Sequence, residues 1–277
     1  MKHKKISIKR MLVYIFALIA ALVIIVPLLW LLMSSFKSNN EIFENPWALP
    51  KVFDIKNYIE AWFAGSIGTY FINTLFYSVV GVILALLFSA MAGFAFSRFN
   101  YKLTKWLFPF LLSGSMIPMI SIIIPLWQML AKIGLLDSYT GIIIVYAASS
   151  ISFSVLILTG SMRNIPKAIE ESAVVDGCGV IQIFTKIFLP LSKPSLVTVG
   201  TIIFIRLWND FLVALVLNSK SKYYTLAVGL KAFVGEHSIN YGQLSAGLML
   251  AIVPPVMLYI ILQKQIVEGI TSGAVKG

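Results

Sequence analysis

Residues 164–195 read NIPKAIEESAVVDGCGVIQIFTKIFLPLSKPS, a long polar stretch between two hydrophobic runs. Asn164 and Pro166 predict a helix start, because a capping residue precedes a proline whose missing N–H costs nothing in the first turn. Asp176-Gly177 is a turn dipeptide and predicts the end of that helix.

A second short helix is predicted after this turn. Its apolar residues recur at i, i+3, i+4, i+7 and i+8, on one face of an α-helix; they are Val180, Ile183, Phe184, Ile187 and Phe188. Leu189-Pro190 and Pro194 predict its end, because proline breaks the interior of a helix. We therefore expect two short helices that lie against a membrane.

The composition of the whole chain indicates a polytopic membrane protein. Of its 277 residues, 59% are hydrophobic and 12% are charged, whereas a soluble domain has about 25% charged residues. Runs long enough to cross a bilayer predict spans at residues 11–33, 70–96, 106–131, 140–162, 196–217 and 244–262. Pro118 and Pro125 should kink the third span, and Pro254-Pro255 should bend the sixth.

Two local patterns add detail to this arrangement. Tyr58, Ile59, Trp62 and Phe63 suit a short amphipathic helix at the membrane interface. Small residues along the second span allow close packing of another helix; they are Gly81, Ala85, Ser89, Ala90 and Gly93.

The N-terminal run has two readings. Residues 1–10, MKHKKISIKR, carry five basic residues before the apolar run. A signal peptide would have an apolar core of about 7–15 residues and a small-residue cleavage site. This run is longer and ends in Ser34-Ser35-Phe36-Lys37, so a retained first span is predicted.

The net charge is +11, and the distribution of the basic residues indicates how the chain is oriented in the membrane. Six spans put both termini, the 97–105 loop and the 163–195 loop on one side, and these segments hold fourteen basic residues. The opposite loops hold seven. The positive-inside rule therefore places both termini and the 163–195 loop of this multi-pass chain in the cytoplasm. Nucleic-acid binding has no support.

The sequence gives no sign of a catalytic or metal site. Cys178 is the single cysteine, and His3 and His237 stand apart from any cluster at metal-ligand spacing. No glycine-rich phosphate loop is present, so we expect no ATPase site of its own, no cofactor and no metal.

The polar stretch resembles the EAA loop of ABC-importer permeases. Its matching positions, in order, are Glu171-Ser172-Ala173, Asp176-Gly177, Phe184, Ile187, Leu189-Pro190 and Pro194. Ser172 replaces the first alanine of the motif, a change of one small residue for another. The rest of the chain is similar to the carbohydrate branch, the maltose and multiple-sugar permeases. The resemblance implies an all-α integral membrane protein with the type I importer permease fold and a cytoplasmic coupling helix pair.

The resemblance also implies partners. In this family the coupling helix sits in a groove of an ATPase subunit, and the complex holds a second related permease subunit, two ATP-binding subunits and an extracytoplasmic sugar-binding protein. The coupling residues would be Glu170, Glu171, Ala173, Asp176, Gly177, Phe184, Leu189 and Pro190. Glu170 and Glu171 lie early in their helix, where carboxylates suit the helix dipole. The alternative is that the segment is a simple linker.

Arg206 and Asp210 lie near the middle of the predicted fifth span. They are four residues apart, so a continuous helix would place them on one face as an ion pair, beside Asn209. Such a pair could fix helix packing, or it could lie on the solute path. Trp208-Asn209-Asp210-Phe211 resembles a stretch of sugar permeases.

These observations predict three parts. Residues 1–69 form the cytoplasmic N-terminus, first transmembrane helix and extracytoplasmic segment; residues 70–263 form the permease domain; residues 264–277 form a pliable cytoplasmic tail. The tail resembles that of maltose-type permeases, or it is a disordered end. The expected function is ATP-driven import of a sugar, with an oligosaccharide favoured. Import of another solute such as glycerol phosphate, a secondary transporter and a membrane scaffold are the alternatives.

Overall fold

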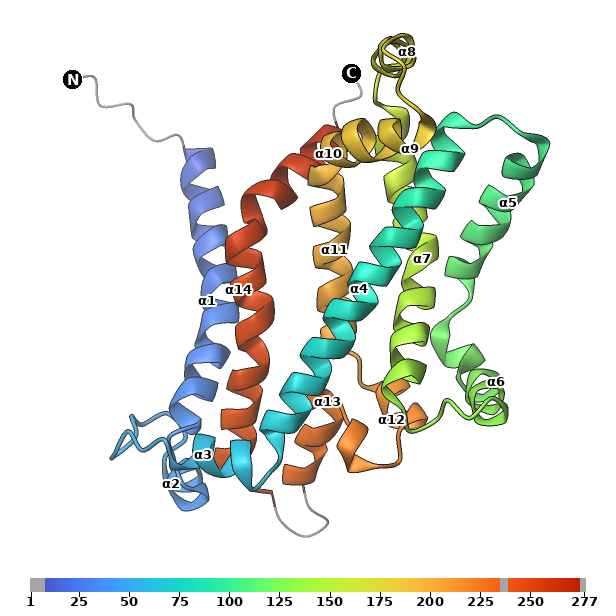
Figure 1. Cartoon of the computed structure of the whole chain (residues 1–277). Helices are drawn as coiled ribbons and strands as arrows, with labels where there is room; N and C mark the ends of the chain where they lie inside the picture. Colours follow the sequence, from blue (N-terminus) through green and yellow to red (C-terminus); the bar gives the residue numbers. More distant parts are fainter. Residues whose placement is uncertain (1–7, 235–238, 275–277) are drawn as a thin grey trace. The chain divides into compact units, whose positions relative to one another are not determined.

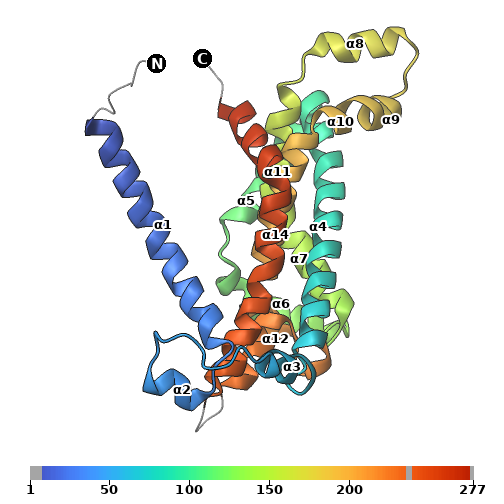
Figure 2. The same cartoon turned by 90° about the vertical axis from the view of Figure 1, so that its left-hand side faces the viewer.

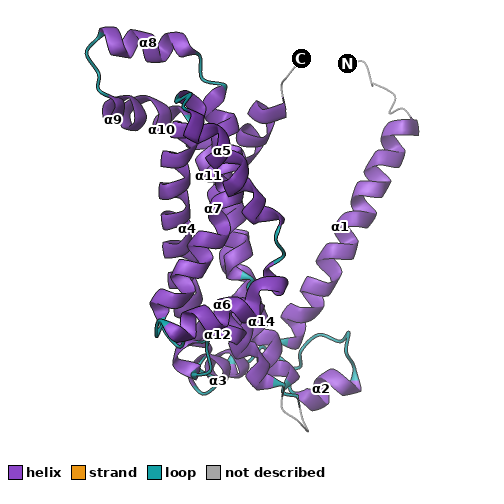
Figure 3. Cartoon of the chain, turned by 90° about the vertical axis from the view of Figure 1, so that its right-hand side faces the viewer, coloured by secondary structure: helices purple, strands orange, loops and turns teal. Residues whose placement is uncertain are grey.

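A computed structural model describes residues 8–234 and 239–274 of the chain, and these residues are largely helical (Figure 3). Within this part the extended structure is limited to one isolated bridge, between Val234 and Ile239. The predicted all-α class is therefore confirmed. Two compact units divide the chain: Met1–Gly68 with Leu230–Ile252, and Thr69–Gly229 with Val253–Gly277.

Four of the described helices are long and apolar enough to cross a membrane. They are α1 (Ile8–Ser34), α4 (Ile67–Arg98), α7 (Tyr139–Arg163) and α14 (Tyr241–Ala274). Two bent helix pairs raise the number of candidate spans to six if each pair is one span. The first pair, Lys102–Met116 with Met119–Lys132, covers the predicted third span. The second joins Val180–Leu191, in the predicted polar loop, to Lys193–Trp208 at 72°, so it covers only the first part of the predicted fifth span.

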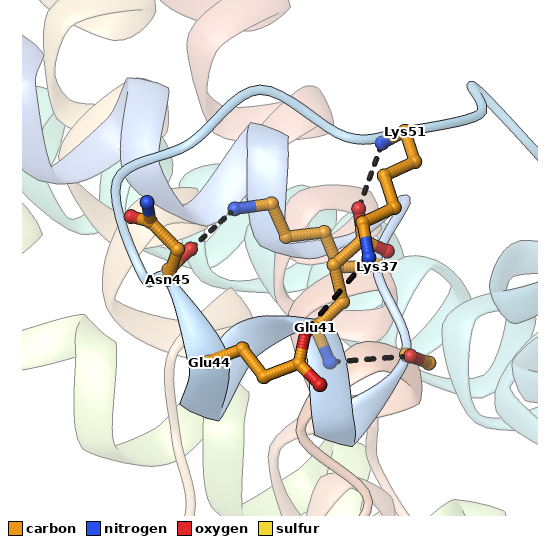
Figure 4. A network of polar contacts seen from close by, with 6 residues as sticks. Lys37, Glu41, Glu44, Asn45 and Lys51 are labelled. Atoms are coloured by element: carbon orange, nitrogen blue, oxygen red, sulfur yellow. Dashed lines mark hydrogen bonds and ion pairs between the residues drawn. The ribbon is translucent and has the colours of Figure 1, made fainter.

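The first unit contains α1, α2 (Asn39–Glu44) and α3 (Lys56–Phe63), so the short helix predicted near Tyr58 is confirmed. A polar network closes the segment around α2 (Figure 4). The buried Lys37 donates from Nζ to the carbonyls of Asn45 and Pro46 at 3.2 and 3.4 Å. The backbone N–H of Lys51 donates to Glu41 Oε1 at 2.7 Å.

In the second unit, α4 packs closely against α7 at the small residues of the predicted stripe. A Cβ on Gly81 would lie 3.2 Å from Cβ of Tyr146, and one on Gly93 would lie 3.2 Å from the backbone nitrogen of Thr159. Ala85 is fully buried. The two helices can approach this closely because these positions lack bulky side chains.

The third span is broken more sharply than predicted. α5 (Lys102–Ser113) and the short η1 (Gly114–Met116) meet α6 (Met119–Lys132) at an angle of 101°. Pro118 stands at the break, because the residue before a proline avoids the helical conformation. Pro125 lies inside α6, and the helix continues past it. The kink predicted at Pro125 therefore does not divide the helix.

The fifth span is also broken, which corrects the prediction of a continuous helix over 196–217. α11 (Lys193–Trp208) ends at Asn209, and α12 (Leu212–Leu217) follows. Shorter elements then lead to α14: η3 (Ser221–Tyr223), α13 (Leu226–Gly229) and η4 (Leu230–Phe233).

The last helix, α14, includes Pro254 and Pro255 and stays helical to Ala274. The predicted tail is therefore helical up to that residue, where a glycine inside a helix costs only about 1 kcal/mol, and its pliability stays a prediction. Residues 275–277 of the predicted tail lie outside the described part.

Candidate functional site: a coupling segment and a broken-span cavity

The coupling segment, Asn164–Ser195, contains two successive helical stretches at the ends of α4 and α11 (Figures 1 and 2). The first is α8 (Lys167–Val175). The second is continuous through α9 (Val180–Ile183), the π-helical η2 (Phe184–Phe188) and α10 (Leu189–Leu191). The prediction of two short helices joined at Asp176-Gly177 is confirmed.

The turn between them is a Schellman motif. Gly177 has a φ of 80°, and its N–H donates to the carbonyl of Val174 at 3.0 Å. The N–H of Cys178 donates to the carbonyl of Ala173 at 2.9 Å. These bonds satisfy the last carbonyls of α8, and the left-handed conformation explains the glycine.

The predicted start of the segment is corrected, whereas its predicted end is confirmed. Asn164 caps the C-terminus of α7, and α8 starts at Lys167, after Pro166. The second stretch ends at Leu191, between Pro190 and Pro194, and the π-helical turn before Pro190 accompanies the proline inside this stretch. The π turn gives Leu189 a bond to the carbonyl of Phe184, five residues back. Pro194 lies in the first turn of α11.

Arg98, the last residue of α4, anchors the segment to the spans. Its side chain is 4% exposed, and its Nε lies 3.3 Å from Glu170 Oε2, an ion pair without an aligned hydrogen bond. Its Nη2 donates to the carbonyls of Met162 and Ile165 at 3.0 and 2.6 Å. The guanidinium also stands 4.6 Å from the ring centroid of Phe188, within cation–π range.

The predicted coupling residues divide into an inner and an outer set. Inner residues face the chain's own core: Glu170 on Arg98, Ala173 at 6% exposure, and Phe184 and Leu189 against the buried cluster. The outer set is exposed and consists of Glu171, Asp176, Gly177 and Pro190. Exposed apolar side chains accompany the outer set; they are Val174, Val175, Val180 and Ile181. The outer surface of the segment is therefore mixed: apolar and acidic around the turn, with the exposed Lys167 and Lys186 on the two helices.

The direct ion pair expected in the fifth span does not form. Among the described residues, the ion pairs within 4.0 Å join Lys51 to Glu44, Lys56 to Glu60 and Arg98 to Glu170. Because α11 ends at Asn209, Arg206 and Asp210 are not on successive turns of one helix. Asn209 donates from Nδ2 back to the carbonyl of Ile205 at 2.9 Å.

Each of the two charges has its own neutral partners instead. Arg206 donates from Nη2 to the hydroxyls of Ser150 and Ser149 at 2.6 and 3.3 Å. Asp210 Oδ2 accepts from the hydroxyl of Tyr146 at 2.8 Å and from the N–H of Ala214 at 3.0 Å. The second bond explains part of the break, since a carboxylate that accepts a backbone N–H can start a new helix.

A cavity of about 510 Å³ lies beside Arg206. Its lining comes from the break of the third span, from α7 and from α11: Gly114, Ser115, Ile117, Pro118, Met119, Ile122, Ser149, Phe153, Ile202, Ile203 and Arg206. Non-helical backbone at membrane depth is tolerated where it lines a water-filled space. A second hollow of about 300 Å³ is lined almost entirely by apolar side chains such as Val82 and Phe204 and offers no polar partner for a polar solute.

Four residues of these sites were missed by sequence reasoning. Arg98 was read only as the basic end of the second span. Tyr146, Ser149 and Ser150 lay in an apolar run, and the signal that could have found them is their polar grouping within one turn of a predicted span.

Asp137, in the loop between α6 and α7, binds the loop that follows α12. Asp137 accepts N–H groups of Ser219 and Lys220 on Oδ1 at 2.7 and 3.0 Å, and the hydroxyl of Ser219 on Oδ2 at 2.8 Å. Partial burial raises the pKa of Asp137, but these hydrogen bonds outweigh it and hold the pKa below its usual range.

This combination of four to six apolar candidate spans, two broken helices and an anchored polar segment indicates a helical membrane protein. Residues 79–272 match the family of the binding-protein-dependent transport system inner membrane component, and the chain belongs to that family. The recognition of an ABC-importer permease from the EAA-like segment is thus confirmed.

Two named relatives and one solved structure are also similar to this chain. The chain is 34% identical over 281 residues, covering 100% of both chains, to the arabinooligosaccharides transport system permease protein AraQ of Halalkalibacterium halodurans. It is 33% identical to the diacetylchitobiose uptake system permease protein NgcG of Streptomyces coelicolor, over 91% of this chain and 84% of the relative. A bacterial ABC transporter involved in the import of the acidic polysaccharide alginate superposes with a TM-score of 0.80 at 25% identity, covering 95% of this chain and 98% of that chain.

Proposed function

We propose that the chain is the membrane-spanning subunit of an ATP-driven importer that moves a carbohydrate, with an oligosaccharide favoured, by alternating access. Family membership and the sugar-importing relatives support this assignment. The observation that carries it is the coupling segment, which has an anchored inner face and an exposed outer face that is apolar and acidic around the turn.

The outer face of α8 would dock on an ATP-binding subunit. Glu171 and Asp176 are exposed beside Val175, which is 87% exposed. Exposed apolar groups rimmed by polar ones mark interaction surfaces. Closure of two ATP-binding subunits would then move α8, and Arg98 would pass the motion to α4 and α7.

The remaining parts of the proposed assembly follow the family. A second related permease subunit would complete the solute route, and an extracytoplasmic sugar-binding protein would deliver the solute. The chain would lie in the cytoplasmic membrane with both termini and the coupling segment in the cytoplasm, as its basic residues indicate.

The docking role is tested by Glu171→Lys in the tagged, membrane-embedded chain. We expect the amount of ATP-binding subunit that co-purifies in mild detergent to fall at least tenfold at equal membrane abundance. The reason is that the positive charge of the lysine would be repelled by the partner surface that accepts the carboxylate of Glu171. Glu44→Lys is the control, since that glutamate is also exposed but belongs to the first unit. Unchanged co-purification with Glu171→Lys would make the segment a simple linker.

A further inference from the structure

Arg206 is a cation whose charge is not neutralised by a contacting carboxylate. No described carboxylate oxygen lies within 4.0 Å of its guanidinium nitrogens. The nearest acidic residue in sequence, Asp210, is bound to Tyr146 and to the start of α12. The structure therefore holds a positive charge in a predicted span without a direct counter-ion.

The contacts that do hold Arg206 leave part of it free. Its three hydrogen bonds to described residues all go to neutral groups of α7, the carbonyl and hydroxyl of Ser149 and the hydroxyl of Ser150. A guanidinium has five N–H donors in a planar fork, so two donors remain available. The side chain is exposed, and it lines the cavity at the two broken spans.

The lining of the cavity strengthens the electrostatic field of Arg206. Arg206 is the charged member of its lining, and the other lining residues are apolar or, like Ser115 and Ser149, neutral. Low-dielectric walls around one sign of charge focus its field and concentrate ions of the opposite sign. A planar guanidinium also matches the two oxygens of a carboxylate or sulfonate.

Resting on the proposed function, we propose that the solute passing this cavity is an anionic carbohydrate, one that bears a carboxylate or sulfonate group bound by Arg206. Ser149 and Ser150 hold the guanidinium in place through neutral groups, so that no described carboxylate contacts it. A neutral sugar would also find hydroxyl partners here, but it would not offset the charge.

The charge preference is measured at a thiol introduced by Ser115→Cys in a Cys178→Ser background, within native membranes. Three methanethiosulfonate reagents are compared at constant ionic strength, with each rate divided by that for a small free thiol in solution: anionic sulfonatoethyl, cationic trimethylammonioethyl and neutral hydroxyethyl. We expect the anionic reagent to react faster than the cationic one, and the ratio to fall at least tenfold when Arg206→Gln is added. Arg206→Lys keeps the charge and should keep the preference.

A second readout uses sugars as competitors of the same reaction. D-glucuronate should slow modification at least twofold more than D-glucose, which has a CH₂OH group in place of the carboxylate. As a control, made in the chain that keeps its native Cys178, Arg206→Gln should leave the reactivity of that thiol in the coupling segment unchanged.

The outcomes separate the two proposals. Reaction with the neutral reagent but no anion preference, a preference that survives Arg206→Gln, or equal effects of the two sugars would overturn the anionic solute. No reaction with any reagent would show that solutes do not reach the cavity, and the proposed transport route would fail with it.

Discussion

Arg98 and Arg206 both lie in the last turn of a long apolar helix of the second unit, yet their surroundings differ. Arg98 is 4% exposed and has Glu170, two carbonyls and the ring of Phe188 around it. Arg206 is exposed to a cavity and is held by serine groups of α7. Removing a charge from water costs free energy unless the charge is paired or hydrogen-bonded.

The comparison separates two uses of a costly charge. Arg98 satisfies its charge within the chain, and its contacts join α4, the end of α7 and both helices of the coupling segment. Arg206 satisfies only part of its hydrogen-bonding capacity within the chain. The contacts of Arg98 suit a residue that transmits motion between helices. The free donors of Arg206 suit a residue that binds a solute.

The largest expected effect comes from removing the link. Arg98→Met leaves Glu170 and the carbonyls of Met162 and Ile165 without their partner, and breaking a buried pair typically costs about 3–5 kcal/mol. We expect co-purification of the ATP-binding subunits to fall at least tenfold at equal membrane abundance. Arg163→Met is the control, because that arginine is exposed at the end of α7. Equal losses in both variants would remove the special role of Arg98.

Double-mutant cycles sharpen the comparison. Arg98→Met with Glu170→Leu should be non-additive by about 1–3 kcal/mol in thermal stability of the purified assembly, since the two side chains touch. Arg206→Met with Asp210→Leu should be less strongly coupled than this pair, because no direct ion pair joins the two charges and they interact only at longer range and through Ser150 and Tyr146. A coupling in the second cycle as strong as that in the first would support the direct ion pair between Arg206 and Asp210 that the sequence predicted.

A smaller effect is expected at the turn of the coupling segment. Gly177→Ala places a side chain at a φ of 80°, and the left-handed conformation costs roughly 1–2 kcal/mol for a residue with a Cβ. We expect solute uptake to fall severalfold at equal abundance. Gly179→Ala is the matched control, with a φ of −74° and open space around its Cα. Similar losses in both would mean that the turn geometry is unimportant.

The smallest effect is expected at Asp137, a carboxylate held by neutral donors. Because hydrogen bonds lower its folded pKa below the usual 3.8, its stabilisation is present above that pH and is lost as the pH falls through the folded value. The melting temperature of Asp137→Asn should lie slightly below that of the parent at pH 6, and the difference should shrink below about pH 4. A difference that grows in acid would contradict this assignment.

The sequence predicted the spans and the two-helix segment because long apolar runs, capping residues and turn dipeptides act locally. It could not show the break at Asn209, since Arg206 and Asp210 are spaced for one helix face and the competing bonds come from Tyr146 and Ser150 of another helix. Arg98 was missed for the same reason, because its partner Glu170 is remote in sequence. The cavity arises only when two broken spans meet α7.

The central claim, that Arg98 holds the coupling segment while Arg206 serves the solute, is tested most directly at the single native cysteine, Cys178, beside the turn. The measurement is the rate of maleimide labelling of Cys178 in native membranes for the parent chain, Arg98→Met and Arg206→Met. We predict severalfold faster labelling in Arg98→Met and a parental rate in Arg206→Met. Equal acceleration in both variants, or none in Arg98→Met, would contradict the division of roles between the two arginines.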